Sequence, residues 1–249
     1  MPKTMVRLEK TLPPETPAAC RNLLLAALPA AEYQRLRPHL KPILLRPGQV
    51  LHEEGNTISR VYFLAEGIAS FTLTCEQGIE IELSIVGNEG MVGLRALMGG
   101  GPTTIRAVVE IGGSSWWMPA DVLLEDFRRG GKLQDLLMRQ IQARLTETAQ
   151  TALCNHLHTL EERLSRWLLI IYDRSHSTEL DLTQEFIARM LATRRPAVTA
   201  TAHILKKAGL IDYHRGHITI RDPEGLQDCA CGCYKVIHQA VEASLVTSA

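Results

Sequence analysis

Basic side chains gather near the C-terminal end of this 249-residue chain and give its strongest chemical signal. Between positions 189 and 215 the sequence carries six Lys and Arg residues and a single acid, Asp212. Side chains of this kind neutralise phosphate oxygens, and phosphate contacts dominate the affinity of proteins for nucleic acid. The whole chain has 27 basic and 27 acidic side chains, so the basic surface is a local feature. The pattern favours a nucleic-acid-binding segment within a neutral protein.

Two short helices and a hairpin are predicted around these residues, from position 182 to 220. Thr183 and Thr193 are each suited to cap a helix, and a proline follows the second cap within the first turn, where it is tolerated. Gly209 suits a helix end, and the turn 214–217 separates two short apolar strands. This order predicts a winged helix-turn-helix, which places its second helix in the DNA major groove.

We expect the DNA contacts to come from the two helix starts, the outer face of the second helix and the wing. The alternative interpretation is a helical hairpin whose basic face is simply solvated. The candidate contacts are Thr183, Gln184, Thr193, Arg194, Arg195, Thr199, His203, Lys206 and Arg215.

The remaining sequence must position this module, and its pattern changes twice. From about residue 23 to 131, short apolar runs alternate with turn dipeptides such as Pro47-Gly48 and Glu66-Gly67, which indicates a jelly-roll or barrel of antiparallel strands. Leu133 to His158 then lacks Gly and Pro and predicts one helix of unusual length, which commonly lies along a second copy of itself. The alternative for this helix is packing within one chain.

The predicted fold class is therefore α+β, with a jelly-roll sensor, a dimerisation helix and a winged helix-turn-helix. We predict a flexible lead-in at 1–22, the jelly-roll at 23–131, the long helix at 132–159, the DNA-binding domain at 160–225 and a C-terminal extension at 226–249.

Several classes of protein are excluded or disfavoured by the sequence. No run of 18 apolar residues predicts a membrane helix, and the first 20 residues lack the apolar region of a secretory signal. Six cysteines in this arrangement do not resemble a secreted disulfide framework, so we expect a cytoplasmic protein without a membrane partner. No nucleophile elbow, zinc-protease motif or phosphate-binding loop is present, and we expect no enzymatic activity.

The order of these parts resembles the Crp/Fnr family of bacterial transcription regulators, over roughly residues 23–220. The resemblance implies a homodimer, a cyclic-nucleotide-binding-like sensor, two-fold-related operator DNA as partner, RNA polymerase as a further partner of an activator, and a small-molecule effector. It rests on Arg46-Pro47-Gly48-Gln49-Val50-Leu51, Glu54-Gly55, the segment Val61 to Gly67, Leu182-Thr183, Ile187-Ala188, Arg195 with Val198, and Gly209-Leu210-Ile211.

The sensor departs from the cyclic-AMP-responsive members at both ligand-binding elements. Their Gly-Glu-x-Gly reads Gly90-Met91-Val92-Gly93 here, and methionine cannot accept a ribose hydrogen bond as a carboxylate does. Their phosphate-binding arginine falls on Gly101-Pro102-Thr103, so the residues do not favour cyclic AMP. Glu89 and Arg106 could substitute only if the loop were rearranged. The pocket implied by the resemblance involves Gly90, Val92, Gly93, Thr103, Thr104, Arg106 and Thr148, the last of which could equally be a plain interhelical threonine.

The recognition helix departs at one position as well. Many members place a glutamate after the first arginine, where it accepts from a cytosine amine. Here Arg195 is followed by Pro196, whose side chain cannot accept a hydrogen bond. The resemblance therefore implies a guanine contact for Arg195 and an altered preference at the neighbouring base pair.

Cysteines offer two further hypotheses about cofactors. The iron–sulfur members of the family use clustered N-terminal cysteines, and Cys20 alone cannot supply such a set. Near the C-terminus, Cys229, Cys231 and Cys233 are candidate metal ligands, although tight tetrahedral sites usually show longer spacing and no fourth ligand is evident. Small packing residues are the alternative, so no metal is predicted and the effector stays unknown.

The sequence thus leads to a dimeric, sequence-specific DNA-binding regulator with a sensor that does not use cyclic AMP. The competing hypothesis is a small-molecule or redox sensor whose helix-turn-helix contacts a partner protein. The basic residues at Arg194 and Arg195 favour the first, since phosphate contacts require them.

Overall fold

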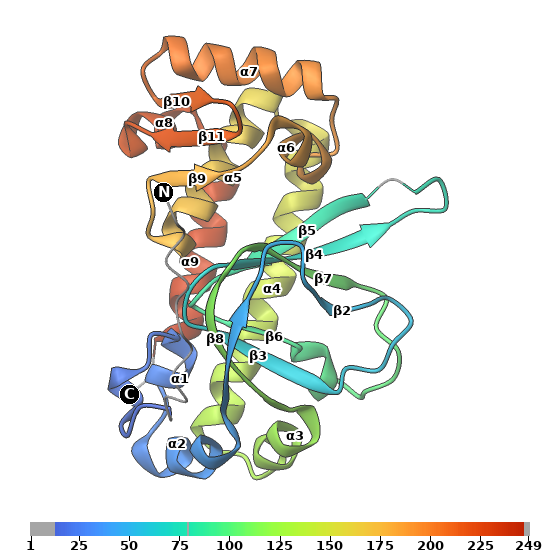
Figure 1. Cartoon of the computed structure of the whole chain (residues 1–249), viewed down its shortest axis with the longest axis vertical. Helices are drawn as coiled ribbons and strands as arrows, with labels where there is room; N and C mark the ends of the chain where they lie inside the picture. Colours follow the sequence, from blue (N-terminus) through green and yellow to red (C-terminus); the bar gives the residue numbers. More distant parts are fainter. Residues whose placement is uncertain (1–12, 79, 247–249) are drawn as a thin grey trace, which may run out of the picture.

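The computed structural model describes residues 13–78 and 80–246 (Figure 1). A β-roll occupies one end of the molecule, a domain with a small sheet and short helices occupies the other, and the long helix α4 (Lys132–Leu157) runs between them. The predicted helix of unusual length and the α+β class are confirmed. Among the described residues, no helix is both long enough and apolar enough to cross a membrane.

Two four-stranded antiparallel sheets form the β-roll and confirm the predicted jelly-roll. The strands coincide with the apolar runs between turn dipeptides, because alternate side chains enter the space between the two sheets. One of the apolar runs that predict these strands is Ile79 to Val86, and its first residue, Ile79, lies outside the described residues. One sheet has the order β1 (Lys41–Leu45), β8 (Gly113–Pro119), β3 (Arg60–Leu64) and β6 (Met91–Val92); the other has β2 (Val50–His52), β7 (Arg106–Ile111), β4 (Ile68–Thr74) and β5 (Glu80–Val86).

Short helices close the ends of the roll. They are η1 (Pro17–Ala19), α1 (Leu23–Ala26), α2 (Ala30–Leu36), η2 (Arg37–His39), η3 (Leu94–Leu97) and α3 (Ala120–Arg128). Residues 1–12 of the predicted flexible lead-in lie outside the described residues. Its described part contacts α2, because Tyr33 donates a hydrogen bond to the Pro14 carbonyl and Arg37 donates to the carbonyls of Pro13 and Pro14.

The second long helix, α5 (Leu160–Ser175), begins directly after α4. Thr159 and Glu162 form a reciprocal capping box at its start, which satisfies two backbone N–H groups that a helix start leaves free. His176 ends the helix with φ of 52°, in the left-handed region common at helix ends. α5 then leads into the C-terminal domain.

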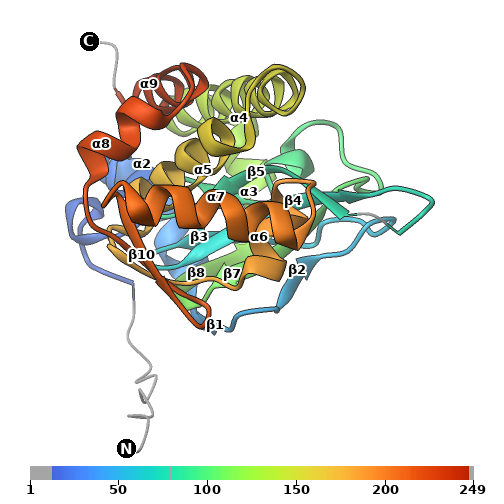
Figure 2. The same ribbon diagram turned by 90° about the horizontal axis from the view of Figure 1, so that it is seen from above.

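The C-terminal domain contains the predicted pair of helices and the hairpin. These are α6 (Gln184–Met190), α7 (Arg195–Lys207), β10 (Ile211–His214) and β11 (His217–Ile220), and β9 (Glu179–Asp181) adds a third strand to the hairpin. The residues beyond the wing form α8 (Pro223–Cys229) and α9 (Cys233–Leu245), and α9 lies along α4 (Figures 1 and 2). The strands β6 and β9 were not predicted from the sequence. The packing of the C-terminal extension on α4 was not predicted either.

The β-roll and the C-terminal domain share buried contacts. Ile68 and Ile85 of the roll belong to the same apolar core as the helices of the C-terminal domain. Within this contact, Trp167 of α5 donates its indole N–H to the Glu82 carboxyl of β5 at 2.9 Å. Burial raises the pKa of Glu82 to about 8; the Trp167 hydrogen bond and Arg166 oppose this, while Glu147 and Glu110 add to it.

Glu82 therefore predicts a pH-dependent stability for this contact. A raised pKa in the folded state means that the contribution of Glu82 is fully present below pH about 4.5 and is lost as the pH rises through about 8. The variant Glu82→Gln keeps the acceptor for Trp167 and cannot ionise. Urea unfolding at pH 6 and pH 8.5 should show a loss of stability in the wild type that is smaller in the variant by on the order of 2 kcal/mol. Glu76→Gln, on the exposed turn of the same hairpin, is the matched control; equal pH dependence in all three proteins would contradict this assignment.

Candidate nucleic-acid interface and ligand pocket

The helix-turn-helix has one confirmed cap and one that differs from the prediction. The Thr183 side chain accepts a hydrogen bond from the Phe186 N–H, as expected for the start of α6. The predicted cap at Thr193 is wrong: Arg194 occupies the cap position of α7 and its side chain forms no cap. Ala192 takes φ of 45°, and the Thr193 N–H is used to close the end of α6 by donating to the Ala188 carbonyl. This tight turn places Thr193 one residue too early to cap α7.

The outer face of α7 is polar and open. Arg195, Thr199 and His203 follow one another at intervals of four residues and are all exposed, so they form one row along the helix. The opposite face buries Val198, Ala202 and Leu205 in the core of the domain, which fixes the rotation of the helix. The row begins with a guanidinium, that of Arg195, at the helix start.

The start of α6 adjoins this row. The Thr199 hydroxyl donates to the Gln184 side chain at 2.6 Å and to the Arg195 carbonyl at 3.0 Å. Gln184 is thereby held beside the centre of the outer face of α7. Arg194 is exposed at the turn between the two helices.

The wing is a tight hairpin with its basic residue at the tip. Arg215 and Gly216 both have positive φ, of 47° and 87°, as a two-residue hairpin turn requires. Lys206 of α7 forms an ion pair with Asp212 of β10, so its charge is partly balanced by the wing. His217 of β11 forms hydrogen bonds with Asp181 and Glu179 of β9 and so links the two strands below the wing tip. These hydrogen bonds raise the pKa of His217.

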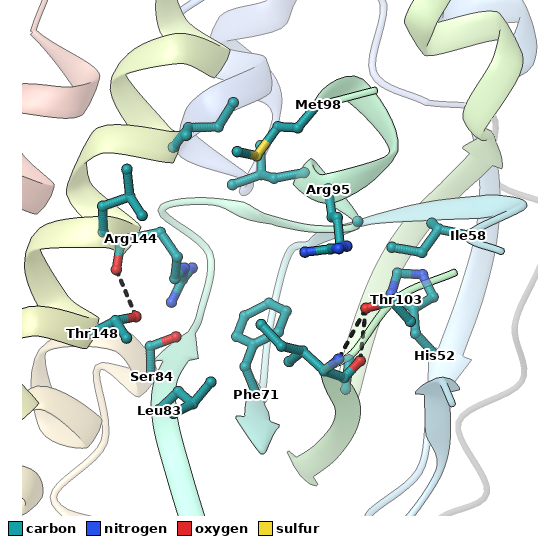
Figure 3. A pocket seen from close by; sticks show the side chains of 16 residues that line it. His52, Ile58, Phe71, Leu83, Ser84, Arg95, Met98, Thr103, Arg144 and Thr148 are labelled. Carbon is teal, nitrogen blue, oxygen red and sulfur yellow. Dashed lines mark hydrogen bonds between the residues drawn. The ribbon is translucent and has the colours of Figure 1, made fainter. Parts of the chain in front are cut away.

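A cavity of about 230 Å³ lies between the β-roll and α4 (Figure 3). Most of its lining is apolar, including Phe71, Leu83 and Ile105 from the roll and Ile141 and Leu145 from α4. Mostly apolar concave sites with a few converging polar groups are the usual form of small-molecule sites. The cavity is therefore the candidate effector pocket of this sensor.

Only part of the predicted pocket lines this cavity. Gly93, Thr103 and Thr148 do, whereas Gly90, Val92, Thr104 and Arg106 do not. The Thr103 hydroxyl is used locally, because it donates to the Ile105 carbonyl and accepts from the Ile105 N–H. The Thr148 hydroxyl donates to the Arg144 carbonyl of its own helix.

Packing accounts for the two glycines of the 90–93 loop. A Cβ at Gly90 would lie 2.7 Å from the Gln140 amide oxygen of α4, and a Cβ at Gly93 would lie 2.8 Å from Val61. Gly93 also has φ of 112°, a conformation that side chains disfavour. Gly90 thus allows the loop to pack closely on α4, and Gly93 allows it to pack on β3 within the roll.

The two residues considered as substitutes for the missing nucleotide ligands have other partners. Glu89 forms an ion pair with Arg174 at 3.2 Å and accepts from the Gly87 N–H. Arg106 pairs with Glu53 at 3.1 Å and Glu80 at 3.4 Å. Neither side chain lines the cavity.

Two arginines that the sequence analysis missed supply the charge of the pocket. Arg95 of η3 and Arg144 of α4 enter the cavity from opposite sides (Figure 3). Arg144 stacks on the Phe71 ring at 4.7 Å and pairs with Glu147. Arg95 forms no ion pair among the described residues, so its guanidinium is available to a ligand anion. Position in the fold, not sequence spacing, reveals both residues.

A buried ion network joins the pocket wall to the C-terminal domain. Arg174 of α5 donates two parallel hydrogen bonds, both 3.0 Å, to Glu147 of α4. Although burial alone would raise it, the pKa of Glu147 lies below its ordinary value because Arg174 and Arg144 face it. Glu147 remains ionised and holds α4 and α5 together through charge-assisted bonds. The network consists of Glu89, Arg144, Glu147 and Arg174.

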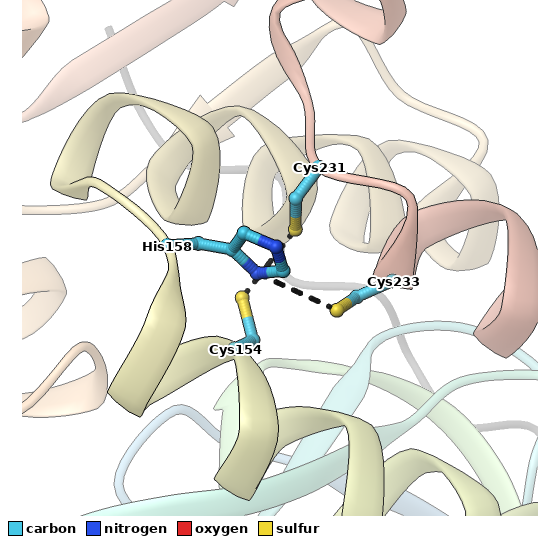
Figure 4. Close-up of side chains that lie close together, drawn as sticks. All are labelled: Cys154, His158, Cys231 and Cys233. Carbon is cyan, nitrogen blue, oxygen red and sulfur yellow. Dashed lines mark hydrogen bonds between the residues drawn. The ribbon is translucent and has the colours of Figure 1, made fainter.

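The cysteine candidates are partly regrouped by the fold. Cys231 and Cys233 lie beside Cys154 and His158 at the end of α4, whereas Cys229 does not belong to the group (Figure 4). Cys154 and His158 were not predicted as candidate metal ligands from the sequence, although their four-residue spacing on a predicted helix puts them on one face.

Two protein-family models match this chain, one over the β-roll and one over the C-terminal domain. The model of the cyclic nucleotide-binding domain matches residues 42–129, and the model of the Crp-like helix-turn-helix domain matches residues 162–229. The "Global nitrogen regulator" of Nostoc sp. is 22% identical over 178 residues, which cover 68% of this chain and 80% of that protein.

Solved structures share the fold. FixK2 from Bradyrhizobium japonicum matches with a TM-score of 0.67 and 16% identity, over 78% of this chain and 98% of that chain. A transcriptional regulator of the CRP/FNR family from Thermus thermophilus matches with a TM-score of 0.60 and 21% identity, over 76% of this chain and 98% of that chain. With a cyclic nucleotide-binding domain joined through α4 to a Crp-like helix-turn-helix, the chain belongs to the Crp/Fnr family of transcription regulators.

Proposed function

We propose that this regulator binds two-fold-related operator DNA as a homodimer and that an organic anion in the β-roll cavity controls this binding. The observation that carries the proposal is the exposed row Arg195, Thr199 and His203 on α7, flanked by the basic wing tip. A row of this length with a guanidinium at its start suits the edges of successive base pairs in the major groove. Gln184, Arg194 and Arg215 flank the row where phosphates would lie.

An exposed apolar stripe on α4 supports the dimer. Met138 and Leu145 are 53% and 63% exposed in one chain. Together with Ile141, Thr148 and Ala152 they follow a spacing of three and four residues, which is the seam of a two-stranded coiled coil. α9 contacts α4 and leaves Met138 and Leu145 exposed within one chain, whereas Ile141 is buried against the β-roll. A second copy, related by a two-fold axis, covers the stripe most simply.

The cavity lies directly behind that seam. Ile141, Leu145 and Thr148 belong both to the seam and to the cavity lining. A bound ligand would therefore act on the spacing of the two α4 helices. Arg144 links the same wall to Glu147 and so to Arg174 of α5, which gives the ligand a physical route to the DNA-binding domain.

The lining of the cavity favours an apolar organic anion as effector. Arg95 and Arg144 provide positive charge, and the remaining walls are mostly apolar. In the responsive members a carboxylate accepts from the ribose hydroxyl, and the described lining of this cavity contains no carboxylate.

Whether the protein activates or represses transcription depends on a contact with RNA polymerase. An activator needs that contact, and a repressor does not. Under the competing hypothesis the helix-turn-helix contacts a partner protein instead of DNA. The affinity for such a partner should depend much less steeply on salt concentration, because only phosphate contacts release many counterions.

Arg195→Ala is predicted to abolish specific operator binding while the fold is kept. Arg195 is exposed, and its loss removes a guanine contact worth about 1–3 kcal/mol of discrimination. Fluorescence anisotropy on a genomic fragment that the wild type shifts in a gel, over a salt series, measures both specificity and the salt slope. Arg46→Ala, on an exposed turn of the β-roll, should behave as the wild type. Unchanged specificity in Arg195→Ala, or a flat salt response of the wild type, would refute this docking.

Leu145→Glu is predicted to produce monomers. The side chain is exposed in one chain, so the fold tolerates the charge, whereas two glutamates facing each other across the seam repel. Sedimentation equilibrium at micromolar concentration should give a dimer for the wild type. Ile204→Glu, at a 50% exposed apolar residue on α7, is the matched control and should remain dimeric. A monomeric wild type would contradict the proposal.

Cyclic AMP is predicted to bind at least about a hundredfold more weakly than it binds to responsive members, since two lost charge-assisted bonds of about 1.5–3 kcal/mol each compound. Calorimetry with cyclic AMP, cyclic GMP and octanoate tests the ligand class. Octanoate should bind the wild type more tightly than Arg95→Gln. Micromolar cyclic AMP binding, or equal octanoate binding by both proteins, would show that the pocket has been misassigned.

A further inference from the structure

Three cysteines and a histidine converge where α4 ends and α9 begins (Figure 4). Cys154 and His158 come from α4 and the residue that follows it, and Cys231 and Cys233 come from the segment between α8 and α9 and the first residue of α9. Their four candidate ligand atoms all lie within 4.8 Å of one another. The cysteines are 0–5% exposed, so this is a group of thiols removed from water.

Two of the distances within this group match those around one tetrahedral metal ion. The Cys154 and Cys231 sulfurs are 3.5 Å apart, and the Cys233 sulfur is 3.6 Å from His158 Nδ1. A zinc ion with bonds of about 2.3 Å to sulfur and about 2.0 Å to nitrogen holds its ligand atoms about 3.5–3.8 Å apart. A 4Fe–4S cluster would place each sulfur on a separate iron and hence farther from the others.

The surroundings suit a closed, negatively charged site. Three thiolates, a neutral imidazole and a divalent ion carry one net negative charge. Arg166 of α5 is 3% exposed, its Nε has no hydrogen-bond partner among the described residues, and its charge acts on both Cys154 and Cys233. A buried guanidinium beside the group offsets the remaining negative charge, which lowers the cost of burying it.

We propose that Cys154, His158, Cys231 and Cys233 bind one zinc ion and that this ion holds the start of α9 against the C-terminal end of α4. Four protein ligands leave no open position, which is the arrangement of structural zinc sites. Thiolates with one imidazole in tetrahedral order select zinc over harder cations.

The position of the site gives it a structural consequence. His158 lies two residues before α5, at the point where the sensor helix passes into the DNA-binding domain. Gln140, nearer the start of α4, makes a second link to α9, because its side-chain amide donates a hydrogen bond to the Ser244 hydroxyl at 2.8 Å. A metal bond at one end and this hydrogen bond near the other would hold α9 along α4 and fix the joint between the two domains. Removal of the metal would leave the connection between α4 and α5 without this restraint.

Metal content tests the proposal directly. The full chain, purified with reductant, should contain about one zinc per chain by mass spectrometry of the elements. Cys231→Ser and His158→Ala should retain less than about a tenth of it at equal chelator exposure. His158→Cys should retain the metal because it supplies a fourth thiolate. Cys229→Ser, in the same segment but outside the group, is the matched control and should remain fully loaded.

Cobalt substitution keeps the test independent of variants that fail to fold. Apo wild-type protein titrated with Co²⁺ under reducing conditions should saturate at one ion and show tetrahedral d–d bands with a thiolate charge-transfer band. Absence of stoichiometric metal and of these bands would overturn the proposal. Iron with acid-labile sulfide, a Cys154–Cys231 disulfide in the reduced sample, or equal metal loss in Cys229→Ser and Cys231→Ser would overturn it as well.

Discussion

The buried bidentate pair between Arg174 and Glu147 is the interaction on which the arrangement of the molecule depends. It joins α5 to α4, and Glu89 and Arg144 extend it to the β-roll and to the pocket wall. Charges removed from water are costly unless every partner is present, so the network is stable only when the roll, α4 and α5 hold these positions together. Loss of one partner would leave an uncompensated charge in the middle of the protein.

This constraint is the basis of the proposed coupling between a ligand in the roll and DNA binding at the far end of the chain. Arg144 lines the cavity and belongs to the network, and Trp167 with Glu82 forms a second buried contact between roll and α5. A ligand anion that competes with Glu147 for Arg144 would change the electrostatic support of Arg174. The coupling is thus a change in one set of charge pairs, transmitted along rigid helices.

Much of this architecture follows from local sequence signals. The turn dipeptides between short apolar runs predict the jelly-roll, the glycine-free stretch after Leu133 predicts α4, and the caps and charges after Leu182 predict the helix-turn-helix. Local signals fail where distant residues meet. Cys154 and Cys231 are 77 positions apart, so their proximity depends on how α9 packs against α4. Arg95 gives no sequence signal as a pocket residue, since only the folded loop turns it into the cavity.

The substitute ligand roles considered for Glu89 and Arg106 show the same limit. Both have the right chemistry and lie near the ligand-binding loop in sequence, yet the fold gives each an ion-pair partner elsewhere. At Thr193 a conformational detail decides the outcome, because the left-handed Ala192 shifts the start of α7 by one residue. Residue type predicts what a side chain can do, and tertiary packing decides with which partner it does so.

Selection of binding sites from a random pool of double-stranded DNA by the full-length protein tests the central claim most directly. A dimer seamed along α4 that presents two α7 helices predicts enriched sites with two inverted half-sites, centred about one helical turn of 10–10.5 base pairs or a multiple of it apart. Enrichment of single asymmetric half-sites, or no enrichment above the starting pool, would contradict the account.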